Sequence, residues 1–345
     1  MKGSFFLGAD KAQKFEIREM QFEEPGDHEV LVKVMACGVC GTDVHIYKGG
    51  QGSAPVTPPV VLGHEFAGIV EKTGRAVTAV KPGDHVTLDP NMYCGICRPC
   101  RMGRKSECEH LYALGVNTNG GFAEYCMCPE TQCFKLNDDV DWNAAAMAEP
   151  LACAVHGIDR AGIIPGQNVL IIGGGTIGLI MAQLAKLSGA AEVMLSEVVR
   201  TKDELAYSVG VDAVIDPLAE NITDAVERIC GVRGADVVIE CVGNVKASQQ
   251  AVEAAAPGAT VVFFGVPALD AKLELPMFDM YKKELTVKGS IINPDTHQRA
   301  VALINSGRLK LSQLISHTYG LGQLEDAIIK QSQADSVKVI VHPYE

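Results

Sequence analysis

The chain has 345 residues, of which 47% are hydrophobic and 21% charged, so it is long enough for two globular domains with separate cores. A net charge of −12 at pH 7 argues against general binding to nucleic acid or to anionic membranes, which requires a basic surface. The longest apolar stretch, residues 169–185, is interrupted by a glycine triplet and by Gln183, and the N-terminus has no apolar stretch of signal-peptide length. We therefore expect a cytoplasmic protein without a membrane span.

Short strand-like runs dominate the first 150 residues of the chain. Three of them, residues 28–37, 66–74 and 84–90, are rich in β-branched side chains and are separated by Gly, Pro and Asp. Residues 49–59 have the composition of a loop. This region predicts a β-rich domain.

Three separate segments of the chain carry side chains of the types that bind metals. They supply Cys40, Thr42, Asp43 and His45, then His64 and Glu65, and then Glu149, Cys153 and His156. A lone His or Glu is more often a hydrogen-bonded structural residue than a ligand. Together, however, they offer the Cys, His and Glu ligands that an open catalytic zinc site uses.

Four cysteines fall within the fifteen residues from Cys94 to Cys108, with the spacing C-x2-C-x2-C-x7-C. The ligands would be Cys94, Cys97, Cys100 and Cys108. In a cytosolic chain of this length, clustered cysteines more often bind metal than form disulfides. Four thiolates leave no open position, so we predict a structural zinc site, with an unligated or iron–sulfur-binding loop as the alternative.

The pattern changes near residue 150, where buried strands begin to alternate with helical stretches. Six strand-like runs follow, from "NVLIIG" through "AEVMLSE", "DAVIDP", "ADVVIECVG" and "ATVVFFGVP" to "ELTVKGSII". Six is the number in a full doubly wound parallel sheet. We predict a Rossmann domain over residues 151–289, with residues 290–345 returning to the first domain and ending in a strand.

The segment "GGGTIG" fits the dinucleotide fingerprint G-x-G-x-x-G with Gly173, Gly175 and Gly178. A strand precedes it, a helix follows, and Glu197 lies nineteen residues beyond its last glycine, at the end of the second strand. Such a carboxylate accepts hydrogen bonds from the adenosine ribose and repels a 2′-phosphate, so we predict NAD over NADP. Arg200 and Lys202 nearby weaken that preference.

Taken in order, these motifs resemble those of the zinc-dependent medium-chain alcohol and polyol dehydrogenases. The resemblance covers essentially the whole chain and rests on Cys40–His45, Gly63–Glu65, the four-cysteine loop, Glu149–Pro150 and Gly173–Gly178. It is strongest for the branch that contains the sorbitol, threonine, butanediol and sugar-alcohol-phosphate enzymes. It implies an α/β two-domain chain, in which a GroES-like β-barrel catalytic domain (1–150 and 290–345) joins the Rossmann domain and the active site lies between them.

The resemblance also implies roles for individual residues. Cys40, His64 and Glu149 would hold the catalytic zinc, with Glu65 next to the metal and able to exchange onto it. Thr42 would hydrogen-bond the substrate oxygen, and His45 would pass its proton to solvent. Cys153 is an alternative third ligand, whereas His156 is expected to be structural. The predicted dinucleotide contacts are Gly173, Gly175, Thr176, Ile177, Gly178, Glu197, Lys202 and Val242, with Val266 and Ile291 assigned by family position.

We therefore expect an oxidoreductase with two Zn²⁺ per subunit and NAD, acting on a polyol or sugar alcohol that is free or phosphorylated. The alternatives are an L-threonine, amino-alcohol or butanediol dehydrogenase and, from a different class, a non-catalytic NADH sensor. Sorbitol itself is in doubt, because Ile291-Ile292-Asn293 stands where sorbitol dehydrogenases carry an Arg-Tyr-type segment. The expected partner is a small-molecule alcohol, with no nucleic acid and no membrane, and the family implies a homotetramer or dimer.

Overall fold

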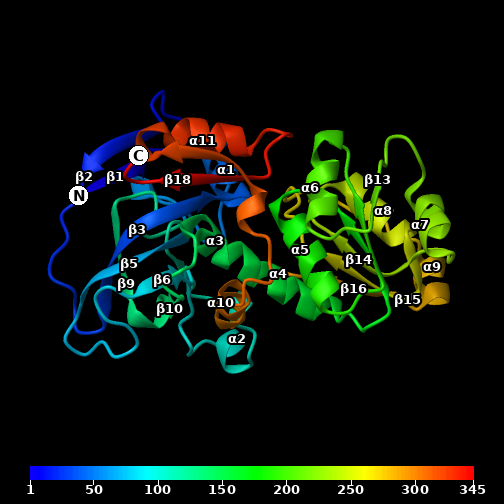
Figure 1. The fold of residues 1–345 in the computed structure, drawn as a ribbon, viewed down its shortest axis with the longest axis horizontal. Coiled ribbons are helices and arrows are strands. Elements are labelled where there is room, and N and C mark those ends of the chain that lie inside the picture. The colour runs from blue at the N-terminus through cyan, green and yellow to red at the C-terminus, as the bar shows by residue number, and fades with distance from the viewer. The chain divides into compact units, whose positions relative to one another are not determined.

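The computed structural model describes residues 1–345, which divide into two compact units. Unit 1 consists of Met1–Ala152 together with Ile292–Glu345, and unit 2 is the continuous segment Cys153–Ile291. In Figure 1, the blue and cyan elements and the red ones near the C-terminus therefore belong to unit 1, and the elements from α5 to β16 belong to unit 2. None of the helices has the length and apolar character needed to cross a membrane.

Unit 1 is built mainly of strands. Its strands are β1 (Lys2–Phe6), β2 (Phe15–Glu19), β3 (Glu29–Val39), β4 (Val60–Val61), β5 (Glu65–Thr73), β6 (His85–Leu88), β7 (Asn91–Met92), β8 (Tyr112–Ala113), β9 (Tyr125–Pro129), β10 (Cys133–Lys135), β17 (Ile315–Gly320) and β18 (Lys338–His342). Its helices are α1 (Gly41–Tyr47), α2 (Arg98–Arg101), α3 (Trp142–Ala146), α10 (His297–Asn305) and α11 (Leu324–Gln331), and α4 (Ala148–Ala161) runs from unit 1 into unit 2.

A seven-stranded sheet in the order β10-β6-β5-β3-β18-β17, with β9 also paired to β3, forms the centre of unit 1. Its longest strand, β3, pairs antiparallel with β5 and with β18, so residues far apart in the chain lie side by side. The sequence of β3, EVLVKVMACGV, is buried along nearly its whole length. Such a continuous apolar run is typical of a strand covered on both faces.

Unit 2 alternates strands and helices. Its strands are β11 (Asn168–Ile172), β12 (Glu192–Ser196), β13 (Ala213–Ile215), β14 (Ala235–Glu240), β15 (Ala255–Phe263) and β16 (Thr286–Gly289). Its helices are α5 (Thr176–Leu187), α6 (Asp203–Ser208), α7 (Ile222–Cys230), α8 (Val245–Glu253) and α9 (Met277–Lys283). All strand pairs are parallel, in the order β13-β12-β11-β14-β15-β16.

Helix α7 of unit 2 begins and ends at residues whose local chemistry favours a helix terminus. The Asn221 side chain accepts hydrogen bonds from the first turn of α7, and Gly231 ends that helix in the left-handed conformation at φ 70°. The buried core combines apolar side chains of β11, β12, β14 and β15 with those of α7 and α8. The six strands predicted between residues 168 and 289 are thus confirmed, and with them the doubly wound sheet.

Candidate functional site

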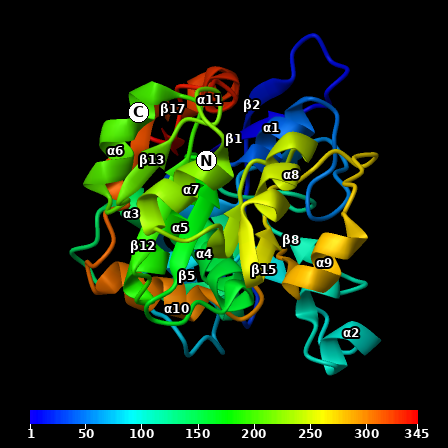
Figure 2. The ribbon, with the colours of Figure 1, turned by 90° about the vertical axis from the view of Figure 1, so that its right-hand side faces the viewer.

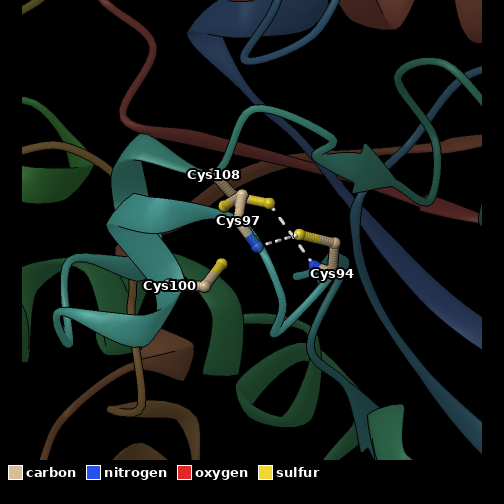
Figure 3. A group of neighbouring side chains, drawn as sticks. All are labelled: Cys94, Cys97, Cys100 and Cys108. Atoms are coloured by element: carbon tan, nitrogen blue, oxygen red, sulfur yellow. Dashed lines mark hydrogen bonds between the residues drawn. The ribbon is translucent and has the colours of Figure 1, made fainter.

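The four cysteines of the 94–108 loop converge on one point. The sulfur atoms of Cys94, Cys97, Cys100 and Cys108 all lie within 4.8 Å of one another, and Figure 3 shows them directed into a common space. The backbone N–H of Cys97 donates to Cys94 Sγ at 3.4 Å, and that of Cys94 donates to Cys108 Sγ at 3.4 Å. Zinc–sulfur bonds of about 2.3 Å in a tetrahedron place sulfurs about 3.8 Å apart, so this donor set fits zinc.

The loop that carries these cysteines lies at the edge of unit 1, where α2 stands out in both views (Figure 1, Figure 2). Of its four cations, two are paired with carboxylates. Arg104 Nε lies 3.7 Å from Glu107, and Lys105 Nζ lies 2.6 Å from Asp295. The second pair ties the loop to the segment before α10. Arg98 remains exposed on α2.

A second group of metal-binding side chains forms where β3 and β5 pair. Gly38 is opposite Glu65 in the antiparallel register, so Cys40, just beyond β3, comes close to His64, just before β5. Ligand atoms of Cys40, His64 and Glu65 lie within 4.8 Å of one another. Cys40 is also the N-cap of α1, so helix and strand together fix its position. A thiolate, an imidazole and a carboxylate form a donor set that fits zinc.

Asp43 lies beneath this group and is fully buried. Its Oδ2 accepts from the Cys40 backbone N–H at 2.8 Å, and its Oδ1 lies 3.7 Å from His64 Nδ1. Burial raises the pKa of Asp43 to about 6. Burial acts to lower the pKa of His64, but the Cys40 thiolate and the Asp43 carboxylate outweigh it and raise that pKa. Because Asp43 faces Nδ1, a metal at this place would take Nε2.

Lys338 in β18 is a residue of this site that the sequence interpretation missed. Lys338 is 1% exposed, its Nζ contacts the Glu65 carboxylate, and it donates to the carbonyl of Val39 at 3.0 Å. Burial acts to lower the pKa of Lys338, yet the neighbouring Glu65 and Cys40 charges raise it. The signal in the sequence was a single cation inside the apolar run "SVKVIVHP".

Glu149 is buried in the first turn of α4 but lies outside the compact Cys40–His64–Glu65 group. Its charge raises the pKa of both His64 and Lys338, so it lies within electrostatic reach of them. Cys153, one turn further along α4, is outside the group as well. The compact group therefore includes Glu65 and leaves out both residues considered as a third ligand.

The two residues expected to move a proton lie on α1. Thr42 Oγ1 accepts from Cys40 Sγ at 3.6 Å, which places the hydroxyl beside the metal-binding group. His45 follows one helical turn later and is exposed to solvent. The helix thus leads from the half-buried Cys40 thiol to the surface.

The glycine fingerprint forms the turn between β11 and α5. Gly173 has φ +102°, and a Cβ on Gly178 would lie 1.8 Å from the Gly173 carbonyl oxygen, so loop and helix touch there. A Cβ on Gly175 would meet nothing within 4 Å. Thr176 and Ile177 open α5, whose N-cap residue, Gly175, makes no side-chain cap bond. The start of a helix after such a turn is a favourable place for an anion.

Glu197 follows β12 and is 7% exposed. Its Oε2 accepts from the Gly174 N–H at 2.6 Å and its Oε1 from the Val199 N–H at 2.8 Å. Arg200 contacts the Glu197 carbonyl oxygen and lies 3.3 Å from Asp203 and 3.9 Å from Asp216. The carboxylate therefore holds the fingerprint loop, and the nearby guanidinium is already engaged by acidic groups.

The remaining predicted dinucleotide residues differ in exposure. Lys202 is buried, at 8% exposed. Val242, Val266 and Ile291 are exposed at 47%, 72% and 59%. All of these residues belong to unit 2.

The chain is similar to proteins of known family over nearly its full length. Residues 26–138 match the alcohol dehydrogenase GroES-like domain, and residues 176–306 match the zinc-binding dehydrogenase family. D-xylulose reductase A of Aspergillus oryzae is 32% identical, with 98% of this chain and 96% of that protein covered. L-threonine 3-dehydrogenase of Pyrococcus abyssi is 35% identical over 94% of each chain.

The chain is also similar in fold and in sequence to solved structures. A protein from Sinorhizobium meliloti 1021 assigned as a zinc-binding dehydrogenase, bound to NADP, superposes with a TM-score of 0.92 at 42% identity, covering 99% of this chain and 100% of its own. With a β-rich unit that gathers two sets of metal-binding side chains and a parallel-sheet unit with a glycine fingerprint, this chain belongs to the zinc-dependent medium-chain alcohol and polyol dehydrogenase family.

Proposed function

We propose that this enzyme oxidises a secondary alcohol of a polyol or sugar alcohol with NAD and reduces the corresponding ketone. The observation that carries the proposal is the convergence of Cys40, His64 and Glu65 beside the Thr42 hydroxyl. The identity with D-xylulose reductase A over nearly the whole chain supports a polyol substrate. Unit 1 would supply the catalytic residues and unit 2 the dinucleotide site.

Cys40, His64 and Glu149 are the proposed ligands of the catalytic zinc, and Glu65 is the ligand that exchanges onto it. Zinc bound there supplies Lewis acidity, which lowers the pKa of an alcohol hydroxyl toward neutrality. Asp43 fixes the imidazole of His64, and Lys338 balances the charge of Glu65 while it is away from the metal. Cys94, Cys97, Cys100 and Cys108 hold the structural zinc.

The proton of the substrate hydroxyl leaves along α1. Thr42 Oγ1 accepts it in a hydrogen bond, and the exposed imidazole of His45 releases it to solvent. Replacing Thr42 with Val removes the hydroxyl at nearly the same volume, so kcat should fall by about 10²-fold or more while zinc content stays unchanged. Replacing Thr42 with Ser keeps the hydroxyl and should retain most of the activity.

The proposed cofactor is NAD, although the similar Sinorhizobium meliloti protein was solved with NADP. The buried Glu197 carboxylate would face the ribose 2′ position and repel a phosphate there. The acidic neighbours of Arg200 make this guanidinium a poor partner for that phosphate. A kcat/KM for NADP equal to or above that for NAD would refute this assignment.

The substrate is tested by NADH formation at mildly alkaline pH with xylitol, sorbitol, their phosphates, 2,3-butanediol and L-threonine. Turnover of a free or phosphorylated polyol supports the proposal, and Cys40→Ser should abolish it. L-threonine is the second candidate, favoured by the 35% identity with the Pyrococcus abyssi enzyme. Turnover of L-threonine alone would replace the polyol assignment.

The enzyme is proposed to act in the cytosol, where thiolate ligands stay reduced, and as a homo-oligomer. An exposed apolar surface on unit 2 supports self-association. It consists of Met277, Phe278 and Tyr281 of α9, which are exposed by 84%, 70% and 81%. Beside it, β16 is an edge strand whose outer backbone groups can pair with a second copy.

A further inference from the structure

Glu240 is a buried carboxylate that the proposed mechanism does not use. It is the last residue of β14 and is 1% exposed. In the parallel register it pairs with Ile172 on one side and Phe263 on the other. It therefore lies at the carboxyl edge of the sheet, immediately beside the strand that leads into the glycine fingerprint. In open parallel sheets this edge is where ligands bind.

Glu240 receives hydrogen bonds from two different loops at this edge. Its Oε1 accepts from the backbone N–H groups of Val242 at 2.6 Å and Gly243 at 2.8 Å. Its main-chain carbonyl oxygen accepts from the N–H groups of Phe264 and Gly265, each at 2.9 Å. One residue thus fixes the turn after β14 through its side chain and the turn after β15 through its backbone.

The turns after β14 and β15 pack backbone against backbone, and the fingerprint loop packs against the Val242 side chain. A Cβ on Gly265 would lie 2.1 Å from the backbone nitrogen of Gly243, and one on Gly243, at φ +81°, would lie 2.4 Å from the Val266 carbonyl oxygen. A Cβ on Gly173 would lie 2.6 Å from Cγ2 of Val242. A displacement of the Val242–Gly243 turn is therefore passed directly to both neighbours.

The exposed side chains of Val242 and Val266 project from this packed edge. A dinucleotide whose pyrophosphate rests on the start of α5 and whose adenosine ribose faces Glu197 must place its other half on the opposite side of β11, over β14 and β15. We propose that Glu240 is a positioning residue: its carboxylate holds the Val242–Gly243 turn in the place where the nicotinamide half of the dinucleotide binds. The proposal rests on the dinucleotide function proposed above.

The test compares binding of NADH with binding of ADP-ribose, which lacks the nicotinamide half. Glu240→Leu removes the acceptor of two N–H groups, so the Kd for NADH should rise about 10-fold or more while the Kd for ADP-ribose stays within about threefold. Glu240→Gln keeps an oxygen acceptor and should bind both ligands like the wild type. Titration followed by nicotinamide fluorescence and by calorimetry measures the two constants.

Asp236 offers a matched control on the same strand. Its carboxylate accepts from the Asn168 N–H at 2.8 Å, at the amino edge of the sheet. Asp236→Leu should lower the melting temperature without changing the ratio of the two dissociation constants. If Glu240→Leu does not fold, Glu240→Asp withdraws the carboxylate by one methylene and should shift the same ratio by a smaller factor.

If Glu240→Leu weakens the binding of NADH and of ADP-ribose equally, or weakens neither, the positioning role is overturned. A wild-type protein that binds neither NADH nor NADPH would instead overturn the dinucleotide function, and the inference with it. If the wild type prefers NADPH, the same comparison is made with NADPH and 2′-phospho-ADP-ribose.

Discussion

At the scale of single residues, Lys338 and Glu65 form a pair in which both side chains are 2% exposed. Lys338→Met would leave the Glu65 carboxylate buried without its cation. Removing one partner of a buried pair costs about 3–5 kcal/mol, so the free energy of unfolding in urea should fall by that amount. Lys338→Arg keeps the positive charge and should recover part of the lost free energy of unfolding. Equal stability of the Met variant and the wild type would show that the Lys338–Glu65 pair does not stabilise the fold.

Substitutions at two glycines of the fingerprint should distinguish an effect on folding from an effect on dinucleotide binding. A Cβ on Gly178 collides with the Gly173 carbonyl, whereas a Cβ on Gly175 meets open space. Gly178→Ala should therefore lower the melting temperature, and Gly175→Ala should keep it while obstructing the approach of the pyrophosphate. Calorimetric melting together with NADH titration distinguishes these outcomes. Loss of stability in Gly175→Ala would contradict the open geometry of this loop.

At the scale of elements, a buried polar network joins the loop after β6 to the segment before α10. Asp89 Oδ1 accepts from the Asn91 N–H at 3.0 Å and from Asn293 Nδ2 at 3.2 Å, and Asn91 Nδ2 donates to Asn293 Oδ1 at 2.7 Å. Burial raises the pKa of Asp89 to about 6, with Asp295 adding to the rise and the hydrogen bonds opposing it. The Asp89 carboxyl in this network therefore holds its proton more tightly than it does in the unfolded chain.

This raised pKa predicts a pH-dependent stability. Because the folded state binds the Asp89 proton more tightly than the unfolded state, the contribution is fully present below about pH 4 and is lost as pH rises through about 6. The loss amounts to as much as about 3 kcal/mol. Asp89→Asn cannot titrate, so the stability of the wild type relative to this variant should fall across that window. Urea unfolding at pH 4 to 7 measures the difference, and a constant difference would contradict the raised pKa.

The sequence predicts elements with a strong local pattern and misses contacts that depend on register. The six strands of unit 2 and the strand at the C-terminal end were recognisable because apolar runs and turn residues mark them locally. Lys338 was missed because 273 residues separate it from Glu65, and only the pairing of β18 with β3 brings them together. The same limit applies to Glu240, whose role depends on two turns packed against a third loop.

The two sets of metal-binding residues place different demands on the sequence. The four-cysteine loop could be predicted from local spacing alone, and its sulfur atoms converge in the structure. The second group depends on three segments that are distant in the sequence. Its compact part, with Cys40 and His64, contains Glu65 rather than Glu149. Which carboxylate binds the metal stays a prediction, because the approach of α4 to this cluster is a tertiary property that no spacing encodes.

At the scale of the whole molecule, the apolar surface on α9 predicts self-association. Phe278→Glu with Tyr281→Lys places charges on two exposed aromatic positions and should dissociate the oligomer into monomers. Light scattering and sedimentation velocity measure the mass. Leu218→Lys changes an apolar residue outside α9, 70% exposed on unit 2, and should leave the oligomer intact. A monomeric wild type would remove the basis for self-association.

The interrupted course of unit 1 has a consequence for biosynthesis. Unit 2 is one continuous segment, so it can fold as soon as it has left the ribosome, while β18 is still to be made. Lys338 is synthesised 273 residues after Glu65, and this synthesis takes some tens of seconds at about 5–20 residues per second. During that interval the nascent sheet is open at β3, and the acidic metal-binding group has no cation of its own. Early capture of zinc, or protection by a chaperone, would shorten the period in which this half-built sheet is exposed to aggregation.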